Sequence, residues 1–132
     1  MAPARLTGLL VVSVVAAAFF VWAGSASAVA DFVTPGRAAY CGVSEGEGPL
    51  RLICWRSSDG LTLDMGRFGH AQESVHLSNR GFYQPVPGRV LRYGQTWTRP
   101  RYFRCVSRST GLTCTNRFGH GWWLGRRQSR LF

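Results

Sequence analysis

Apolar and polar residues alternate in short runs along the chain after residue 30. The clearest run covers residues 61–65, and residues 75–78 repeat it more briefly. Alternation with a period of two is typical of a strand that buries one face. Turn signals such as Asp59-Gly60 separate the runs, and no stretch after residue 30 keeps a helical apolar period for three turns. The pattern predicts an all-β fold, a small single domain over residues 31–132 built as an antiparallel sandwich or barrel.

The first thirty residues differ in kind from the rest. A short segment with Arg5 precedes residues 9–23, in which only Ser13 is clearly polar, and residues 24–30 are small. This three-part order predicts a signal helix, a secretory signal peptide over residues 1–30 that is removed on export. The alternative is a membrane anchor formed by residues 6–30, with the domain outside. We therefore expect a secreted or extracytoplasmic protein.

Four cysteines in an exported chain predict two disulfides. Cys41 and Cys54 flank a stretch rich in Gly, Glu and Pro, and Cys105 and Cys114 flank a Ser-Thr-Gly turn. Of the three possible connectivities, these turns favour Cys41–Cys54 and Cys105–Cys114, each joining neighbouring strands of one hairpin. Zinc binding is disfavoured because there is no Cys-x-x-Cys pair and exported thiols oxidise. We expect no metal and no cofactor.

Charge is distributed unevenly along the chain. The 132 residues carry sixteen basic and six acidic side chains, for a formal net charge of +10, and every basic residue is Arg. The last acidic residue is Glu73, so residues 74–132 contain eleven Arg and no carboxylate side chain. The absence of Lys is also typical of biased codon usage, but such a bias does not explain why the acids stop. Paired-carboxylate catalysis is excluded from the C-terminal half.

Aromatic residues alternate with the arginines from residue 80 onward. Arginine forks bind phosphate or carboxylate, and aromatic rings stack on bases or sugars, although at least half of the rings are expected in the core. We therefore hypothesise a binding module for an anionic envelope polymer, another polyanion or the envelope surface, acting as a monomer. The candidate binding residues are Trp97, Arg99, Arg101, Arg104, Arg108, His120, Trp122, Arg126 and Arg127.

Two further features leave alternatives open. The Gly-His-Gly-Trp-Trp segment at residues 119–123 suits a protein-interaction or inhibitor domain that inserts this segment into a partner. His120 could face a ligand or simply occupy a tight turn, and a strand would point Trp122 and Trp123 to opposite faces. Catalysis is not expected, because the three histidines occur without a nucleophile signature.

The tetrapeptide Arg-Phe-Gly-His occurs twice, at residues 67–70 and 117–120. The first copy begins 13 residues after Cys54 and the second 3 residues after Cys114. The repeat is compatible with a loose two-unit domain and, because the spacing differs, equally with coincidence.

The C-terminal third carries a resemblance to a known family. Residues 111–116 (Gly-Leu-Thr-Cys-Thr-Asn) are followed by Gly-His-Gly-Trp at residues 119–122, and residues 32–36 (Phe-Val-Thr-Pro-Gly) precede the first cysteine. This series resembles a family of small secreted actinobacterial proteins of unknown function. The resemblance covers the outer two-thirds of the mature chain, with Trp122 where the family usually has Phe and Gly125 where it usually has Ser. It implies secretion and a disulfide-linked β fold, and no activity.

Overall fold

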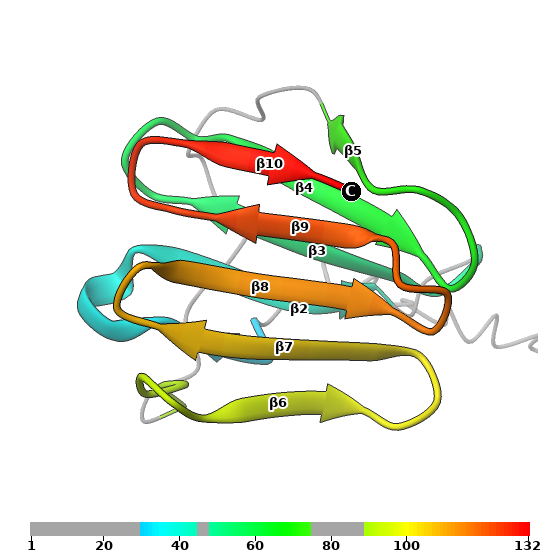
Figure 1. Ribbon diagram of the computed structural model, residues 1–132, viewed down its shortest axis with the longest axis horizontal. Coiled ribbons are helices and arrows are strands. Elements are labelled where there is room, and N and C mark those ends of the chain that lie inside the picture. Colours follow the sequence, from blue (N-terminus) through cyan, green and yellow to red (C-terminus); the bar gives the residue numbers. More distant parts are fainter. Residues whose placement is uncertain (1–29, 45–47, 75–88) are drawn as a thin grey trace, which may run out of the picture.

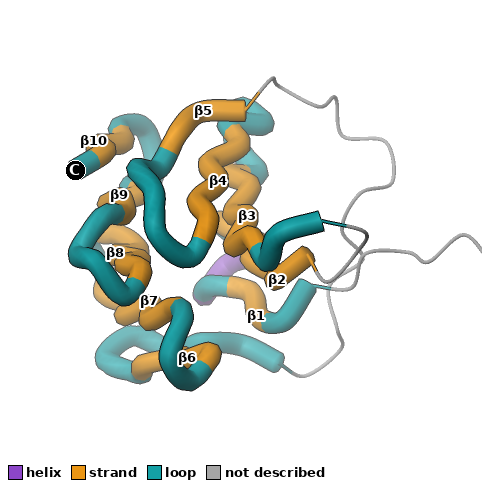
Figure 2. Tube along the Cα trace, turned by 90° about the vertical axis from the view of Figure 1, so that its right-hand side faces the viewer, coloured by secondary structure: helices purple, strands orange, loops and turns teal. Residues whose placement is uncertain are grey.

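Two five-stranded antiparallel sheets pack face to face (Figures 1 and 2). The structure is a computed structural model that describes residues 30–44, 48–74 and 89–132. The first sheet contains β1 (Phe32–Val33), β2 (Ala39–Ser44), β3 (Arg51–Arg56), β4 (Thr62–Gly66) and β5 (Gln72–Ser74). The second contains β6 (Thr96–Arg99), β7 (Phe103–Arg108), β8 (Gly111–Asn116), β9 (Gly121–Leu124) and β10 (Ser129–Leu131). A 3-10 turn, η1 (Pro35–Arg37), precedes β2.

This architecture confirms the predicted all-β antiparallel fold and identifies it as a sandwich. The alternating run at residues 61–65 corresponds closely to β4, whose Leu63 and Met65 are buried between the sheets. The predicted signal peptide, apart from Ala30, and the run at residues 75–78 lie outside the described residues.

The two halves of the chain build their sheets in the same way. In each sheet the strands follow one another in sequence order, β1 to β5 in one layer and β6 to β10 in the other. Strands that are adjacent in sequence pair through short connections, so each half forms a meander from local hairpins. The chain is therefore a sandwich of two sequential meanders, one from each half.

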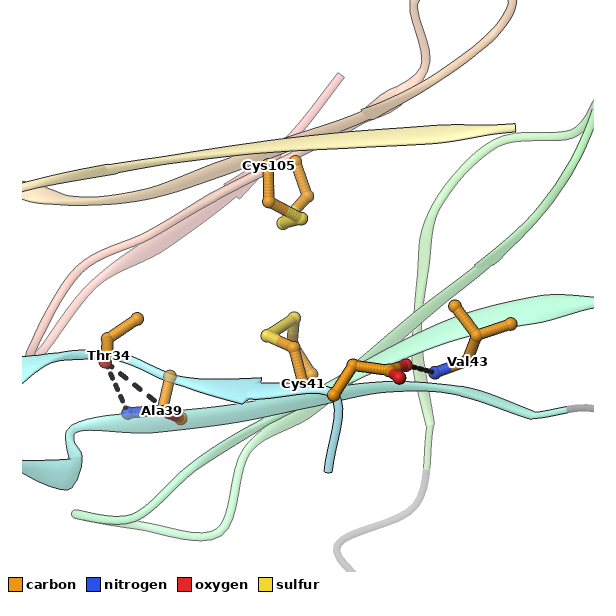
Figure 3. The surroundings of a disulfide bond; sticks show 8 residues. Thr34, Ala39, Cys41, Val43 and Cys105 are labelled. Carbon is orange, nitrogen blue, oxygen red and sulfur yellow. Dashed lines mark hydrogen bonds between the residues drawn. A yellow bond between two sulfur atoms is a disulfide. The ribbon is translucent and has the colours of Figure 1, made fainter. Parts of the chain in front are cut away.

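The predicted disulfides are both present. Cys41 pairs with Cys54 across β2 and β3, and Cys105 pairs with Cys114 across β7 and β8, with each pair directly opposite in register. All four cysteines are fully buried, and Figure 3 shows the two bridges facing each other between the sheets. The core around them is formed by the inward residues of both sheets, chiefly Phe32, Leu52, Leu63, Met65, Leu112, Trp122 and Leu124.

Removing one bridge is expected to weaken the sandwich substantially. The Cys105→Ala/Cys114→Ala variant should lose about 3 kcal/mol of unfolding free energy, because the unfolded chain regains the freedom of a short closed loop. Urea unfolding followed by far-UV circular dichroism measures the loss. An unchanged midpoint would show that this bridge adds nothing to stability.

Two buried polar side chains join the sheets at opposite ends of the sandwich. Arg56, the last residue of β3, donates from Nη1 to the carbonyl oxygens of Gly125 and Gln128, each at 3.0 Å. Asn116, the last residue of β8, donates from Nδ2 to the carbonyl oxygens of Gly66 at 3.1 Å and Gly69 at 2.8 Å.

The two contacts between the sheets are made from equivalent positions in the two halves. Arg56 and Asn116 each stand two residues after the second cysteine of their hairpin, and each binds two carbonyls three residues apart in the other sheet. The two Arg-Phe-Gly-His copies do not occupy equivalent positions, because the first follows β4 and the second follows β8. The two halves therefore share their strand order and these contacts, whereas the tetrapeptide occurs in two turns that are not equivalent.

Candidate binding surface at the twin-loop end

Three connections meet at one end of the sandwich, on the right in Figure 1 and facing the viewer in Figure 2. They join β4 to β5, β6 to β7, and β8 to β9. We call this the twin-loop end and define it as residues 67–70, 99–104 and 117–120. It contains both Arg-Phe-Gly-His copies.

Asn116 holds the two copies together. Its Oδ1 accepts hydrogen bonds from the backbone N–H groups of Phe118 at 3.0 Å and His120 at 3.1 Å, which shapes the second turn. Gly119 completes that turn at a φ of +80°. Because Nδ2 of the same amide binds the carbonyls of Gly66 and Gly69, one side chain fixes both turns in place.

Equivalent side chains of the two copies therefore touch. The imidazole rings of His70 and His120 have centroids 3.8 Å apart, and the phenyl rings of Phe68 and Phe118 have centroids 5.7 Å apart. The guanidinium of Arg67 lies 5.1 Å from the centroid of Phe68 and 5.5 Å from that of Tyr102, within the range of cation–π contact. The two Arg-Phe-Gly-His turns thus bring their rings together, and the Arg67 guanidinium links them to Tyr102.

An open depression of about 760 Å³ lies beside the twin loops. Its walls come from the β6–β7 connection and the end of β8, and four arginines line it: Arg99, Arg101, Arg104 and Arg117. Tyr102 forms part of the lining, and Arg101, Arg104 and Arg117 are exposed. No carboxylate is among the described residues that line it. Such a site attracts anions and offers several guanidinium forks to bind them.

The predicted arginines divide between two places. Arg99, Arg101 and Arg104 lie at the twin-loop end together with His120. Arg108, Arg126 and Arg127 lie at the opposite end, which we define as residues 57–60, 108–111 and 125–128. The arginines of the C-terminal half therefore do not form one patch, because successive strands carry them to alternate ends of the meander.

The opposite end differs in shape and charge. It contains the Asp59 carboxylate, which pairs with Arg56. A narrow crevice of about 40 Å³ lies there, lined by residues such as Tyr93, Arg108 and Arg126. The twin-loop end is the better anion site of the two.

Neither of the two tryptophans predicted to bind the ligand, Trp97 and Trp122, has a fully exposed ring. Trp122 is 0% exposed, because it projects inward from β9 opposite Cys114, so its predicted role in surface binding is wrong. Trp97 is half-buried and packs on Phe32 with ring centroids 5.2 Å apart. As expected from strand alternation, Trp123 points to the other face, where its indole leaves no room for a side chain at Gly111 or Gly125.

Most of the Gly-His-Gly-Trp-Trp segment is a strand and not a loop that could insert into a partner. Residues 121–124 form β9, and only Gly119 and His120 belong to the turn. His120 sits in a tight turn, as one interpretation of the sequence expected, and its carbonyl accepts a bond of 2.8 Å from the Asn116 N–H. Its ring also faces the site, through its contact with His70.

Six residues that the structure places on this surface were not among the predicted site residues: Arg67, Phe68, His70, Tyr102, Arg117 and Phe118. The repeated tetrapeptide is the sequence feature that points to all of them except Tyr102. Repetition alone does not show that two copies meet in space, and that information comes from the packing of the sheets.

Comparisons with known proteins add no identification. No family model, curated protein or solved structure matches the chain. The resemblance to a secreted actinobacterial family therefore stays a prediction. Within residues 30–44, 48–74 and 89–132, no helix is long and apolar enough to cross a membrane, and no cluster of three or more His, Cys, Asp or Glu side chains could hold a metal ion.

Proposed function

We propose that the protein is an extracytoplasmic, non-catalytic binding module that holds an anionic polymer or surface at its twin-loop end. The observation that carries this proposal is the open depression lined by the exposed residues Arg101, Arg104 and Arg117 and by no carboxylate among the described residues. Two buried disulfides support an oxidising, extracytoplasmic environment.

The geometry suits a repeating anion better than a single small one. The depression is open and spans two connections, so neighbouring acidic groups of one chain could pair with different guanidinium forks. Affinity for a polyanion would then come from several exposed charge pairs and would weaken steeply with salt.

Duplex DNA of 20 base pairs serves as a defined model polyanion. The triple variant Arg101→Gln/Arg104→Gln/Arg117→Gln should bind it at least tenfold more weakly at moderate salt. The slope of log K against log[salt] is negative, and its magnitude should decrease by about 2.7, since each lost phosphate contact removes about 0.9. Fluorescence anisotropy across a salt series measures both quantities.

A matched variant distinguishes binding at the twin-loop end from attraction by the net charge of the protein. Arg108→Gln/Arg126→Gln/Arg127→Gln removes the same charge from the opposite end and should keep most of the affinity. Equal losses in the two variants would mean that net charge alone drives binding, and the proposed site would be withdrawn. Absence of measurable binding by the unmodified protein at low salt would overturn the proposal itself.

A further inference from the structure

The twin-loop end exposes large apolar rings among its arginines. Phe68 is 58% exposed and Phe118 is 60% exposed, the two largest exposures among the large hydrophobic residues of the described chain. Both rings occur in turns at the end of the sandwich, and they lie side by side with centroids 5.7 Å apart. Paired apolar rings left in water at a loop tip mark an interaction surface.

Arginines adjoin this pair of rings, and the guanidinium of Arg67 lies 5.1 Å from the centroid of Phe68. Phe68 directly follows Arg67 in the sequence, and Phe118 directly follows Arg117. Arg117 also lines the depression, together with further arginines. A soluble polyanion that exposes no base or sugar face would pair with the arginines and leave the phenyl rings in water. A surface that presents anionic groups over an apolar interior would use both kinds of side chain.

We propose that the surface bound by the twin-loop end is an anionic lipid bilayer, with Phe68 and Phe118 inserted among the acyl chains and the arginines on the lipid headgroups. This inference rests on the proposed function and names its ligand. Apolar insertion and a basic patch are two weak anchors that together give stable membrane association. Arginine suits the second role because its fork pairs with a phosphate in bidentate fashion.

The direction of the first strand agrees with this orientation. β2 runs from Ala39 toward Ser44, and β1 pairs with it in the antiparallel sense. Phe32 pairs with Cys41, whereas the Asp31 carboxylate accepts a hydrogen bond of 2.7 Å from the N–H group of Val43, so residue 31 lies farther along β2 than residue 32. Since β2 ends on the side of the twin-loop end, the chain enters the domain from that side. A bilayer bound at the twin-loop end would therefore lie on the side of the sandwich where β1 begins.

Vesicle binding tests the lipid assignment. The protein is exported from a bacterial host and purified in the processed form, with its N-terminus read by mass spectrometry. Vesicles of 30% phosphatidylglycerol and 70% phosphatidylcholine, at ratios on the order of those in anionic membranes, are compared with pure phosphatidylcholine in a sedimentation assay. The unmodified protein should sediment with the anionic vesicles and not with the neutral ones.

The Phe68→Ala/Phe118→Ala variant is the decisive one. Its affinity for anionic vesicles should fall at least about tenfold, because two phenyl rings no longer leave water on binding. Its affinity for duplex DNA should stay within about twofold of that of the unmodified protein. Tyr93→Ala is the matched control, since Tyr93 is an aromatic residue that is 48% exposed and borders the crevice at the opposite end. It should bind both probes like the unmodified protein. Far-UV circular dichroism and a thermal melt confirm that the variants are folded.

Each outcome has one meaning. Equal vesicle binding by the Phe variant and the unmodified protein would show attraction by charge alone and overturn the lipid assignment. Loss of DNA binding in the Phe variant would also overturn it, because the rings would then stack on the polymer. Binding of DNA without vesicles would reject the bilayer and leave the proposed function standing, whereas failure with both probes would reject both proposals.

Discussion

Replacing Arg56 with Met is expected to lower the unfolding free energy by about 3 kcal/mol, because carbonyl oxygens at the contact between the sheets lose their charged hydrogen-bond donor. The Arg56 side chain is only 6% exposed, and all of its nitrogens are used. Nε and Nη2 bind both Asp59 carboxylate oxygens, and Nη1 binds the carbonyls of Gly125 and Gln128. Met keeps the apolar stem but leaves these acceptors without their donor.

Urea unfolding of three variants tests this expectation. Arg56→Lys should fall between the unmodified protein and Arg56→Met, because an ammonium keeps the charge but cannot reproduce the fork. Arg126→Met at the same end should change stability by less than about 0.5 kcal/mol, since Arg126 is exposed. If Arg56→Met and Arg126→Met unfold at the same urea concentration, the contact between the sheets through Arg56 has no energetic weight.

The value of Arg56 to the fold follows from its equivalence with Asn116. Each side chain ends the third strand of its sheet and binds a carbonyl in the connection after the fourth strand of the other sheet. The meanders are stabilised internally by local hairpins, so these two contacts fix how one meander lies on the other. The Asn116 contact has the additional effect of assembling the twin-loop end.

The local part of this fold is predictable from sequence. Four cysteines with turn-forming residues between them predict both hairpins and both bridges, and the structure confirms them. Alternation at residues 61–65 predicts a strand, because a strand with one buried face needs that period. These features depend on residues close together in the chain, where spacing and turn chemistry suffice.

The arrangement of the site depends on contacts between distant residues and could not be predicted. Alternation predicts that Trp122 and Trp123 point to opposite faces, but it does not say which ring enters the core. Likewise, the arginines at 101 and 108 lie in one short stretch of sequence, yet β7 carries them to opposite ends of the sandwich. The meeting of His70 with His120 requires the packing of two sheets, of which the sequence shows only a repeated tetrapeptide.

The Gly121→Ala substitution is expected to destabilise the protein by about 3 kcal/mol or more, above the usual cost of overpacking. Gly121 begins β9 and pairs with Thr115 of β8. A methyl group added at Gly121 would overlap the carbonyl oxygen of Cys114 and would lie 2.9 Å from the Thr115 Cα. Both neighbours are backbone atoms of the central strand, so relief requires β9 to move away from β8.

Such a movement would also displace His120, which directly precedes Gly121, and with it one of the twin loops. The variant should therefore lose both stability and duplex DNA affinity, the second measured by anisotropy below its unfolding temperature. Gly69→Ala is the matched control, because an added methyl there meets no atom within 4 Å. It should retain stability within about 0.5 kcal/mol. A Gly121→Ala protein as stable as Gly69→Ala would show that β8 and β9 can separate without cost, contrary to the close backbone approach that this glycine permits.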